Sequence, residues 1–222
     1  MFTVSEENYI KSIYHLQHHA GNVTTNELAE RLKTKAASVT DMLKKLQAKN
    51  LLEYEKYYGV RLTQEGKKLA LEVIRRHRLW ENFLVNHLHF GWDEVHEIAE
   101  QLEHVQSETL TDKLDAFMDF PRFDPHGDPI PDRKGKMEML QQINLLQLPV
   151  GQHAEICAVG SQHTALLEML REKNLQIGSM VKITQHYSFD NSIEIAINKQ
   201  PPQNISEQLA KQLFVKKKIG IQ

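Results

Sequence analysis

Hydrophobic positions in the first fifty residues recur at helical spacing in three stretches. Apolar side chains every three or four residues predict a helix over residues 5–19, with Ser5 as a candidate N-cap. A capping-box pattern that starts at Thr24 then introduces a short helix over residues 27–32. After a four-residue turn, a further apolar stripe predicts a helix over residues 37–49. Two short helices joined by a tight turn are typical of DNA-binding proteins, in which the second helix enters the major groove.

The pattern then changes to the alternation of strands. Residues 51–56 and 60–62 predict two short strands, and the turn between them has Gly59 at its tip. The pair is therefore interpreted as a β-hairpin wing of a winged helix-turn-helix. Four side chains of this hairpin are candidates for contact with DNA phosphates: Lys56, Tyr57, Tyr58 and Arg61.

The middle of the chain has side chains at metal-ligand spacing. A long helix over residues 64–89 carries His77 and Glu81 one turn apart, and a second helix is predicted from Trp92 onward. On that second helix, four potential ligands fall within about 100° of arc. These are His96, Glu100, Glu103 and His104. Carboxylates and imidazoles on one face are expected to need a cation, and this ligand set suits Mn²⁺ or Fe²⁺.

An enzyme is the alternative for the same residues. The stretch from His96 to Glu100 comes close to the H-E-x-x-H helix of zinc peptidases, but Glu100 stands where the second histidine is required. No phosphate-binding glycine loop or nucleophile elbow is present in the sequence. Cys157 falls in a predicted strand and is interpreted as a small core residue. A metal-dependent hydrolase therefore remains the weaker reading.

Four prolines between residues 121 and 131 end the helical region. One more helix is predicted over residues 134–146, followed by a small β-barrel with inserted helices. The predicted order in the barrel is strand 154–159, helix 163–173, strands 180–186 and 192–198, and helix 205–213. The fold class is thus mainly α, with a small β-barrel at the C-terminal end. The predicted domains are 1–64 for DNA binding, 65–147 for metal binding and dimerisation, and 148–222 for the barrel.

Charge is distributed unevenly along the 222 residues, whose formal net charge is −2. Residues 1–76 hold 13 Lys and Arg against 9 Asp and Glu, whereas residues 77–147 hold 6 against 14. A basic head suits a polyanion and an acidic middle suits cations, although random surface variation is the plain alternative. The sequence has one cysteine, no apolar run long enough for a membrane helix and no signal-peptide pattern, so a cytoplasmic protein is expected.

These segments together resemble the metal-dependent repressors typified by the diphtheria toxin repressor and the manganese transport regulator. The resemblance covers essentially the whole chain and rests mainly on residues 76–81, 95–105, 55–63 and 124–131. It implies a winged helix, metal-binding dimerisation helices and an SH3-like domain of the ferrous-iron-transport-A type.

The resemblance implies two metal sites in each subunit. The regulatory site is expected to use Asn8, Glu100, Glu103 and His104. A carboxylate at position 100, where iron-responsive members have cysteine, favours Mn²⁺, with Fe²⁺ as the alternative. Asn8 departs from the family, because members have Asp or Met there, and Lys11 replaces an acidic ligand of some short manganese regulators.

The second site is expected to use His77, Glu81 and His96, together with Asp124 and His126. Some members complete this site from the third domain, where His163 is the nearest candidate by position and Gln162 the next.

The resemblance also implies a homodimer that binds double-stranded operator DNA and represses metal-uptake genes when metal is sufficient, without a membrane or a small organic substrate as partner. By this resemblance, the DNA-facing positions of the family are occupied here by Lys35, Ala36, Ala37, Ser38, Thr40 and Asp41, and Lys44 is a further candidate for DNA contact. Asp41 could accept from a cytosine amino group or point to solvent. A metal-free interaction protein that uses its SH3-like domain is the remaining alternative.

Overall fold

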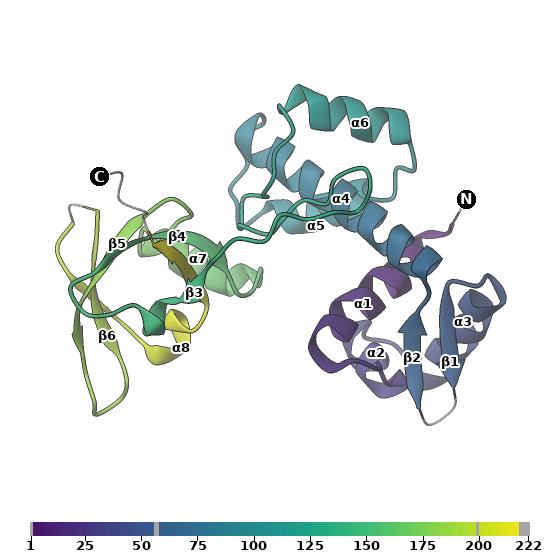
Figure 1. Cartoon of the computed structure of the whole chain (residues 1–222), viewed down its shortest axis with the longest axis horizontal. Coiled ribbons are helices and arrows are strands. Elements are labelled where there is room, and N and C mark those ends of the chain that lie inside the picture. The colour runs from purple at the N-terminus through teal and green to yellow at the C-terminus, as the bar shows by residue number, and fades with distance from the viewer. Residues whose placement is uncertain (1, 56–57, 199, 218–222) are drawn as a thin grey trace. The chain divides into compact units, whose positions relative to one another are not determined.

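The computed structural model describes residues 2–55, 58–198 and 200–217 (Figure 1). Their contacts divide the chain into two compact units, which differ from the three predicted segments. The first unit contains residues 1–80, 100–119 and 130–137, and the second contains 81–99, 120–129 and 138–222. None of the described helices is long and apolar enough to cross a membrane.

The first unit begins with a winged helix-turn-helix. Its elements are α1 (Val4–Ala20), α2 (Thr25–Arg31), α3 (Ala36–Ala48), β1 (Leu52–Glu55) and β2 (Gly59–Leu62). A single apolar core unites them, in which Ile10, Leu43 and Leu62 are buried with the first turns of the following helix.

Side-chain caps define where the first two helices start. Thr24 and Glu27 form the expected capping box of α2. Ser5, however, is not the cap of α1, because the helix starts earlier and Thr3 accepts from the Glu6 amide. The Glu6 side chain accepts from the Thr3 amide in return, so that both orphan amides are satisfied.

The hairpin is a close fit against the loop that precedes α2. Its strands pair antiparallel from Leu52 with Leu62 to Glu55 with Gly59. Gly59 has φ of 97°, and a Cβ there would lie 2.8 Å from the Val23 carbonyl oxygen. Glycine is therefore required at the start of β2, both for its conformation and for this close approach.

Three helices follow the hairpin: α4 (Gln64–Asn86), α5 (Val95–Leu102) and α6 (Glu108–Phe117). The prediction that one helix carries His96, Glu100, Glu103 and His104 is wrong, because α5 ends at Leu102 and the last two lie in the next turn. The Glu103 carbonyl oxygen accepts from the Arg76 side chain instead of a helical amide. The sequence reading also missed α6, which Ser107 caps.

The helix predicted over residues 134–146 is absent from the described chain. Asp132 accepts from the amides of Lys134 and Lys136, and Gly135 has φ of 77°, so this stretch closes a tight turn. The chain then continues to β3 (Ile143–Asn144) and to the 3₁₀ helix η1 (Leu145–Gln147).

The second unit is built on a six-stranded antiparallel sheet in the order β3-β8-β4-β5-β6-β7. The remaining elements are β4 (His153–Val159), α7 (Thr164–Glu172), β5 (Met180–His186), β6 (Ile193–Ile197), β7 (Gln203–Ile205), α8 (Glu207–Ala210) and β8 (Leu213–Lys217). The predicted last helix over 205–213 is wrong except at its centre, since Leu213 and Val215 are buried in alternation on β8. Cys157 is buried on β4, as expected. The helical N-terminal region and the antiparallel C-terminal domain confirm the predicted fold class.

A loop over residues 124–128 is fixed against β4 within this unit. Asp124 Oδ1 accepts from the amides of His126 and Asp128, and the Val159 amide donates to the His126 carbonyl oxygen. Gly127 has φ of 88°, and a Cβ there would lie 2.0 Å from the carbonyl oxygen of Cys157.

We expect Gly127→Ala to destabilise the protein by about 3 kcal/mol or more, because backbone on both sides of the contact must move. Gly151→Ala is the matched control, since Gly151 also has a positive φ, of 85°, but open space around it. This control should cost about 1 kcal/mol from conformation alone. Urea unfolding of both variants measures the difference, and equal losses would contradict the assigned contact.

Candidate metal centres and DNA-binding surface

Glu103 is fully buried in the first unit and is surrounded by cationic or polar donors. Lys11 Nζ on α1 lies 2.7 Å from Oε1 and 2.8 Å from Oε2, and His77 Nδ1 on α4 donates to Oε2 at 2.6 Å. Burial alone would raise the pKa of the Glu103 carboxyl, but the hydrogen bond with His77 and the charge of Lys11 hold this pKa below its ordinary value. Glu103 is therefore an ionised carboxylate in contact with α1.

His104 is hydrogen-bonded to another buried carboxylate, that of Glu7 on α1. Its Nδ1 donates to Glu7 Oε2 at 2.6 Å, and Arg76 of α4 donates to Glu7 Oε1 at 2.7 Å. This leaves Nε2 of His104 facing Glu103 Oε1, at 3.7 Å. A carboxylate that holds one ring nitrogen so that the other can ligate is a common support for metal-binding histidines.

The other two expected ligands of the regulatory site are less closely placed. Glu100 Oε1 lies 3.5 Å from Lys11 Nζ, at the edge of the same cluster. Asn8 is half-buried on α1, and no side-chain hydrogen bond joins it to Glu103 or His104 in the described chain. The ammonium of Lys11 thus stands between Glu100 and Glu103.

The second unit contains another buried cluster, centred on Glu81 of α4. The ligand atoms of Glu81, Asp124 and His126 lie within 4.8 Å of one another, and all three side chains are buried. His96 of α5 approaches from the same unit, with Nδ1 3.1 Å from Glu81 Oε1. His77, the remaining expected ligand, lies one helical turn before Glu81 on α4.

His126 is oriented by its surroundings in a way that suits a cation. Its Nε2 donates to the Trp92 carbonyl oxygen at 2.7 Å, and the two rings stack at 5.8 Å. Its Nδ1 is buried without a hydrogen-bond partner, 3.6 Å from Glu81 Oε2. Burial alone would lower the pKa of His126, but the carboxylates of Glu81 and Asp124 raise it to about 9. The cluster therefore favours positive charge, and a divalent cation fits its donors.

The third-domain candidates do not reach this cluster through any contact of the described residues. His163 is an exposed N-cap residue of α7, and its amide donates to Ser161. Gln162 instead donates to Asp128 at 3.1 Å.

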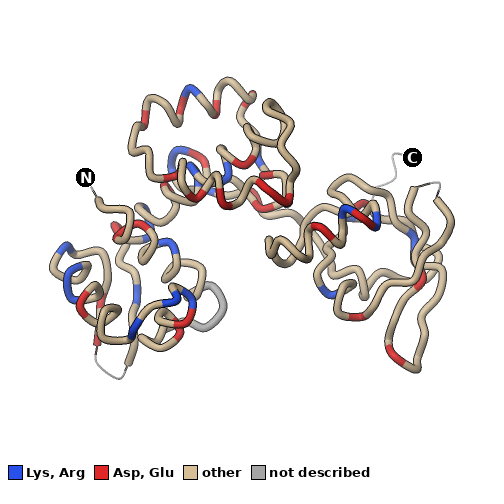
Figure 2. Tube along the Cα trace, turned by 180° about the vertical axis from the view of Figure 1, so that it is seen from behind, with Lys and Arg blue, Asp and Glu red and all other residues tan. Residues whose placement is uncertain are grey.

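The first turns of α3 form an open surface. Lys35 is the N-cap residue but makes no side-chain cap hydrogen bond, so helix amides there are available to a phosphate. Exposed side chains on this surface are Lys35, Ala36, Ala37, Ser38, Asp41 and Lys44, whereas Thr40 is half-buried and donates to the Ala36 carbonyl oxygen. Lys and Arg occur along α3 and the start of α4, whereas Asp and Glu predominate on α5 and α6 (Figure 2).

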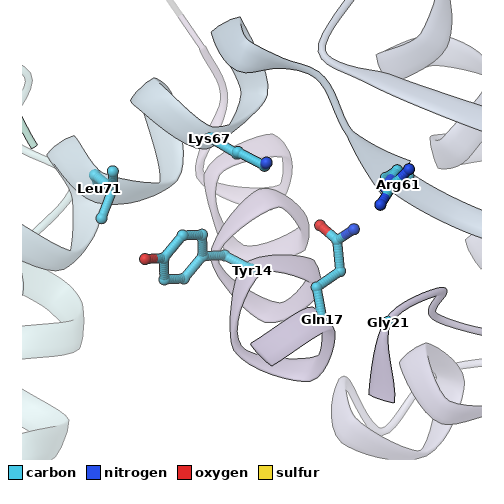
Figure 3. Close-up of a pocket in the computed structure, with 6 residues that line it drawn as sticks. All are labelled: Tyr14, Gln17, Gly21, Arg61, Lys67 and Leu71. Carbon is cyan, nitrogen blue, oxygen red and sulfur yellow. The ribbon is translucent and has the colours of Figure 1, made fainter. Parts of the chain in front are cut away.

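The wing adds exposed Tyr58 and Arg61, while the predicted contacts Lys56 and Tyr57 lie outside the described residues. Arg61 and Lys67 border a cavity of about 490 Å³ between α1, α4 and β2 (Figure 3). Gln17 borders it as well and accepts from the Leu62 amide at 3.1 Å, which ties the wing to α1.

Three family models match the chain in sequence. Residues 1–60 match the N-terminal DNA-binding domain of iron-dependent repressors, residues 63–132 match their metal-binding and dimerisation domain, and residues 143–217 match the FeoA domain. The transcriptional regulator MntR of Bacillus pumilus is 37% identical over 122 residues, which are 54% of this chain and 83% of that protein. The chain belongs to the metal-dependent repressor family.

Other members of the family agree with this assignment. The iron-dependent repressor IdeR of Mycobacterium tuberculosis is 34% identical over 125 residues, which are 56% of this chain and 54% of that protein. The match thus spans about half of that relative's length. A solved manganese-dependent transcriptional repressor in complex with manganese has 31% identity and a TM-score of 0.82, over 95% of this chain and 98% of its own. These relatives are regulators, so the hydrolase alternative has no support from them.

One titratable group of this repressor-family chain was not singled out from sequence. His15 lies on α1, where burial lowers its pKa to about 3, and the cations Arg31, Arg78 and Lys11 act in the same direction. The imidazole is therefore neutral in the folded protein at physiological pH.

We expect His15 to make stability fall as the pH is lowered from 7 towards 5. The unfolded chain gains a proton near pH 6.5, whereas the folded chain does not until about pH 3, so protonation favours unfolding in this window. Relative to His15→Gln, the wild type should lose on the order of 1–2 kcal/mol by pH 5. Chemical denaturation at several pH values measures this, with exposed His153→Gln as the control. Parallel pH profiles for wild type and His15→Gln would contradict the assignment.

Proposed function

We propose that the chain is a homodimeric, cytoplasmic repressor that binds double-stranded operator DNA when a divalent metal is bound, and so represses metal-uptake genes. The observation that carries this proposal is the contact of Glu103 and His104 with α1 of the winged helix, through Lys11 and Glu7. Residues at ligand spacing thus touch the first helix of the DNA-binding fold directly.

The proposed regulatory site uses Glu100, Glu103 and His104, with Asn8 from α1. The proposed second site uses Glu81, His96, Asp124 and His126, with His77 one turn away on α4. The proposal leaves out His163, whose side chain is exposed at the start of α7.

A divalent metal would supply at both places the positive charge that the buried carboxylates require, and the oxygen and imidazole donors favour Mn²⁺, with Fe²⁺ as the alternative. The one cysteine of the chain, Cys157, lies on β4 and is no part of either proposed site. The relatives are named for iron as well as manganese, which leaves both metals in the test below.

In the proposed mechanism, the protein's own residues connect metal binding to DNA binding. Glu7 holds His104 by Nδ1 and so presents Nε2 towards Glu103. Asn8 follows Glu7 on α1. As a metal ligand, it would join the winged helix to Glu103 and His104, which follow α5. Fixing α1 fixes the distance between the two recognition helices of a dimer, which must match half-sites about one helical turn apart.

The DNA contacts divide by chemistry. Lys35, Lys44 and Arg61 carry charges that position the head on phosphates, and binding through them should weaken as salt increases. Ser38 and Thr40 have hydroxyl groups of the kind that read base edges, as does the Asp41 carboxylate.

We expect Mn²⁺ to tighten binding to a duplex from upstream of the chain's own gene by tenfold or more, a coupling of about 1.4 kcal/mol. Glu103→Gln should abolish this tightening, because it removes a charged ligand. Glu108→Gln, an exposed carboxylate on α6, is the matched control. Fluorescence anisotropy measures the affinity for the duplex in the presence of chelator, Mn²⁺ or anaerobic Fe²⁺. A scrambled duplex is the control for sequence specificity. Equal affinity for the duplex with and without bound metal would refute the proposed function.

We expect Lys11→Gln to bind Mn²⁺ about tenfold more tightly than the wild type. The ammonium lies 2.7 Å from Glu103 and 3.5 Å from Glu100, so it competes with a metal for the same carboxylates. Electron paramagnetic resonance of free Mn²⁺ measures the affinity. Lys113→Gln, which removes an exposed charge on α6, is the control. Weaker binding by Lys11→Gln would show that the ammonium organises the site.

A further inference from the structure

Gln106 is bonded to the very beginning of the described chain. Its side-chain amide donates to the Phe2 carbonyl oxygen at 2.7 Å, and its Oε1 accepts from the Phe2 amide at 3.3 Å. One side chain therefore satisfies both backbone groups of a residue 104 positions away. These bonds lie just before Thr3, the residue that caps α1.

Residues 2–6 also contact the C-terminal end of α3, the recognition helix in the proposed function. Lys49, the C-cap residue of α3, donates to Glu6 Oε1 at 2.7 Å, and its Nζ lies 5.4 Å from the centre of the Phe2 ring. Lys45, one turn earlier on α3, lies 3.0 Å from the same oxygen of Glu6. Glu6 is fully buried, so its charge is balanced by these two lysines.

Phe2 and Glu6 thus form a bridge between two parts of the first unit. On one side is the segment 103–106, which contains the proposed ligands Glu103 and His104. On the other side is the C-terminal end of α3. A displacement of either side must break hydrogen bonds to Phe2 or ion pairs to Glu6, because both partners are fixed by several contacts.

We propose that Gln106, Phe2, Glu6 and Lys49 are positioning residues that transmit the state of the segment 103–106 to the recognition helix. This inference rests on the proposed function and adds the route by which it is regulated. Gln106 touches neither DNA nor metal in this scheme. Its effect is on the coupling between the two bindings, not on either binding alone.

Gln106→Leu tests the bridge, because it removes both hydrogen bonds to Phe2 and retains size and charge. Two quantities are measured on the full chain: the Mn²⁺ affinity without DNA, and the ratio of duplex affinities with Mn²⁺ and with chelator at one salt concentration. We expect the ratio to fall fivefold or more, while the Mn²⁺ affinity stays within twofold of the wild type. Gln64→Leu, an exposed glutamine at the start of α4, is the matched control and should keep the wild-type ratio.

Lys49→Met tests the opposite end of the bridge in case Gln106→Leu folds poorly. Any charge it contributes to DNA affects both duplex affinities, so the ratio isolates the coupling. It should lower the ratio as Gln106→Leu does.

The outcomes separate the bridge from the proposed function. A wild-type chain without metal coupling would overturn the proposed function, and the bridge with it. Coupling in the wild type that both variants retain would overturn the bridge alone. Equal weakening of duplex binding with Mn²⁺ and with chelator would assign these residues a structural role only, and would also overturn the bridge.

Discussion

Two neighbouring carboxylates on the first turns of α1, those of Glu6 and Glu7, are buried and must be neutralised. Glu6 is balanced by Lys45 and Lys49 of α3, and Glu7 by Arg76, while His104 Nδ1 donates a hydrogen bond to Glu7. An unpaired buried carboxylate would cost several kcal/mol, so these contacts hold α1 against its neighbours in the first unit. The arrangement of the winged helix therefore depends on buried carboxylates whose partners come from three separate stretches of sequence.

This dependence explains why the sequence revealed the elements better than the site. Helical and alternating periodicity predicted α1 to α4 and the hairpin, since those patterns are local. The turn at Glu103 was not predictable from local pattern, because it depends on Arg76, 27 positions earlier, taking the Glu103 carbonyl oxygen. Likewise, Glu7 gave no signal beyond a favourable charge at a helix start, and its roles emerge only from tertiary contacts.

Two loops show the same limit in a different form. Asp124 and His126 were named through resemblance, yet their convergence on Glu81 depends on a loop that Gly127 seats against β4. The false helix over 134–146 had a suitable pattern, but side-chain acceptance by Asp132 redirected the backbone. In the second case a short-range turn motif overrode the helical propensity of the surrounding residues.

The capping box at Thr3 also fixes the rotational setting of α1. Successive residues on a helix differ by about 100°, so adding or deleting one residue between Thr3 and Glu7 would turn each following side chain to its neighbour's direction. An insertion between Thr3 and Glu6 would turn Glu6 towards the partners of Glu7, and a deletion there would turn Glu7 towards the partners of Glu6. Substitutions in this stretch can be compensated one at a time, but a change in its length cannot. The stretch from Thr3 to Glu7 should therefore be highly sensitive to insertions and deletions, which change every following contact of α1 at once.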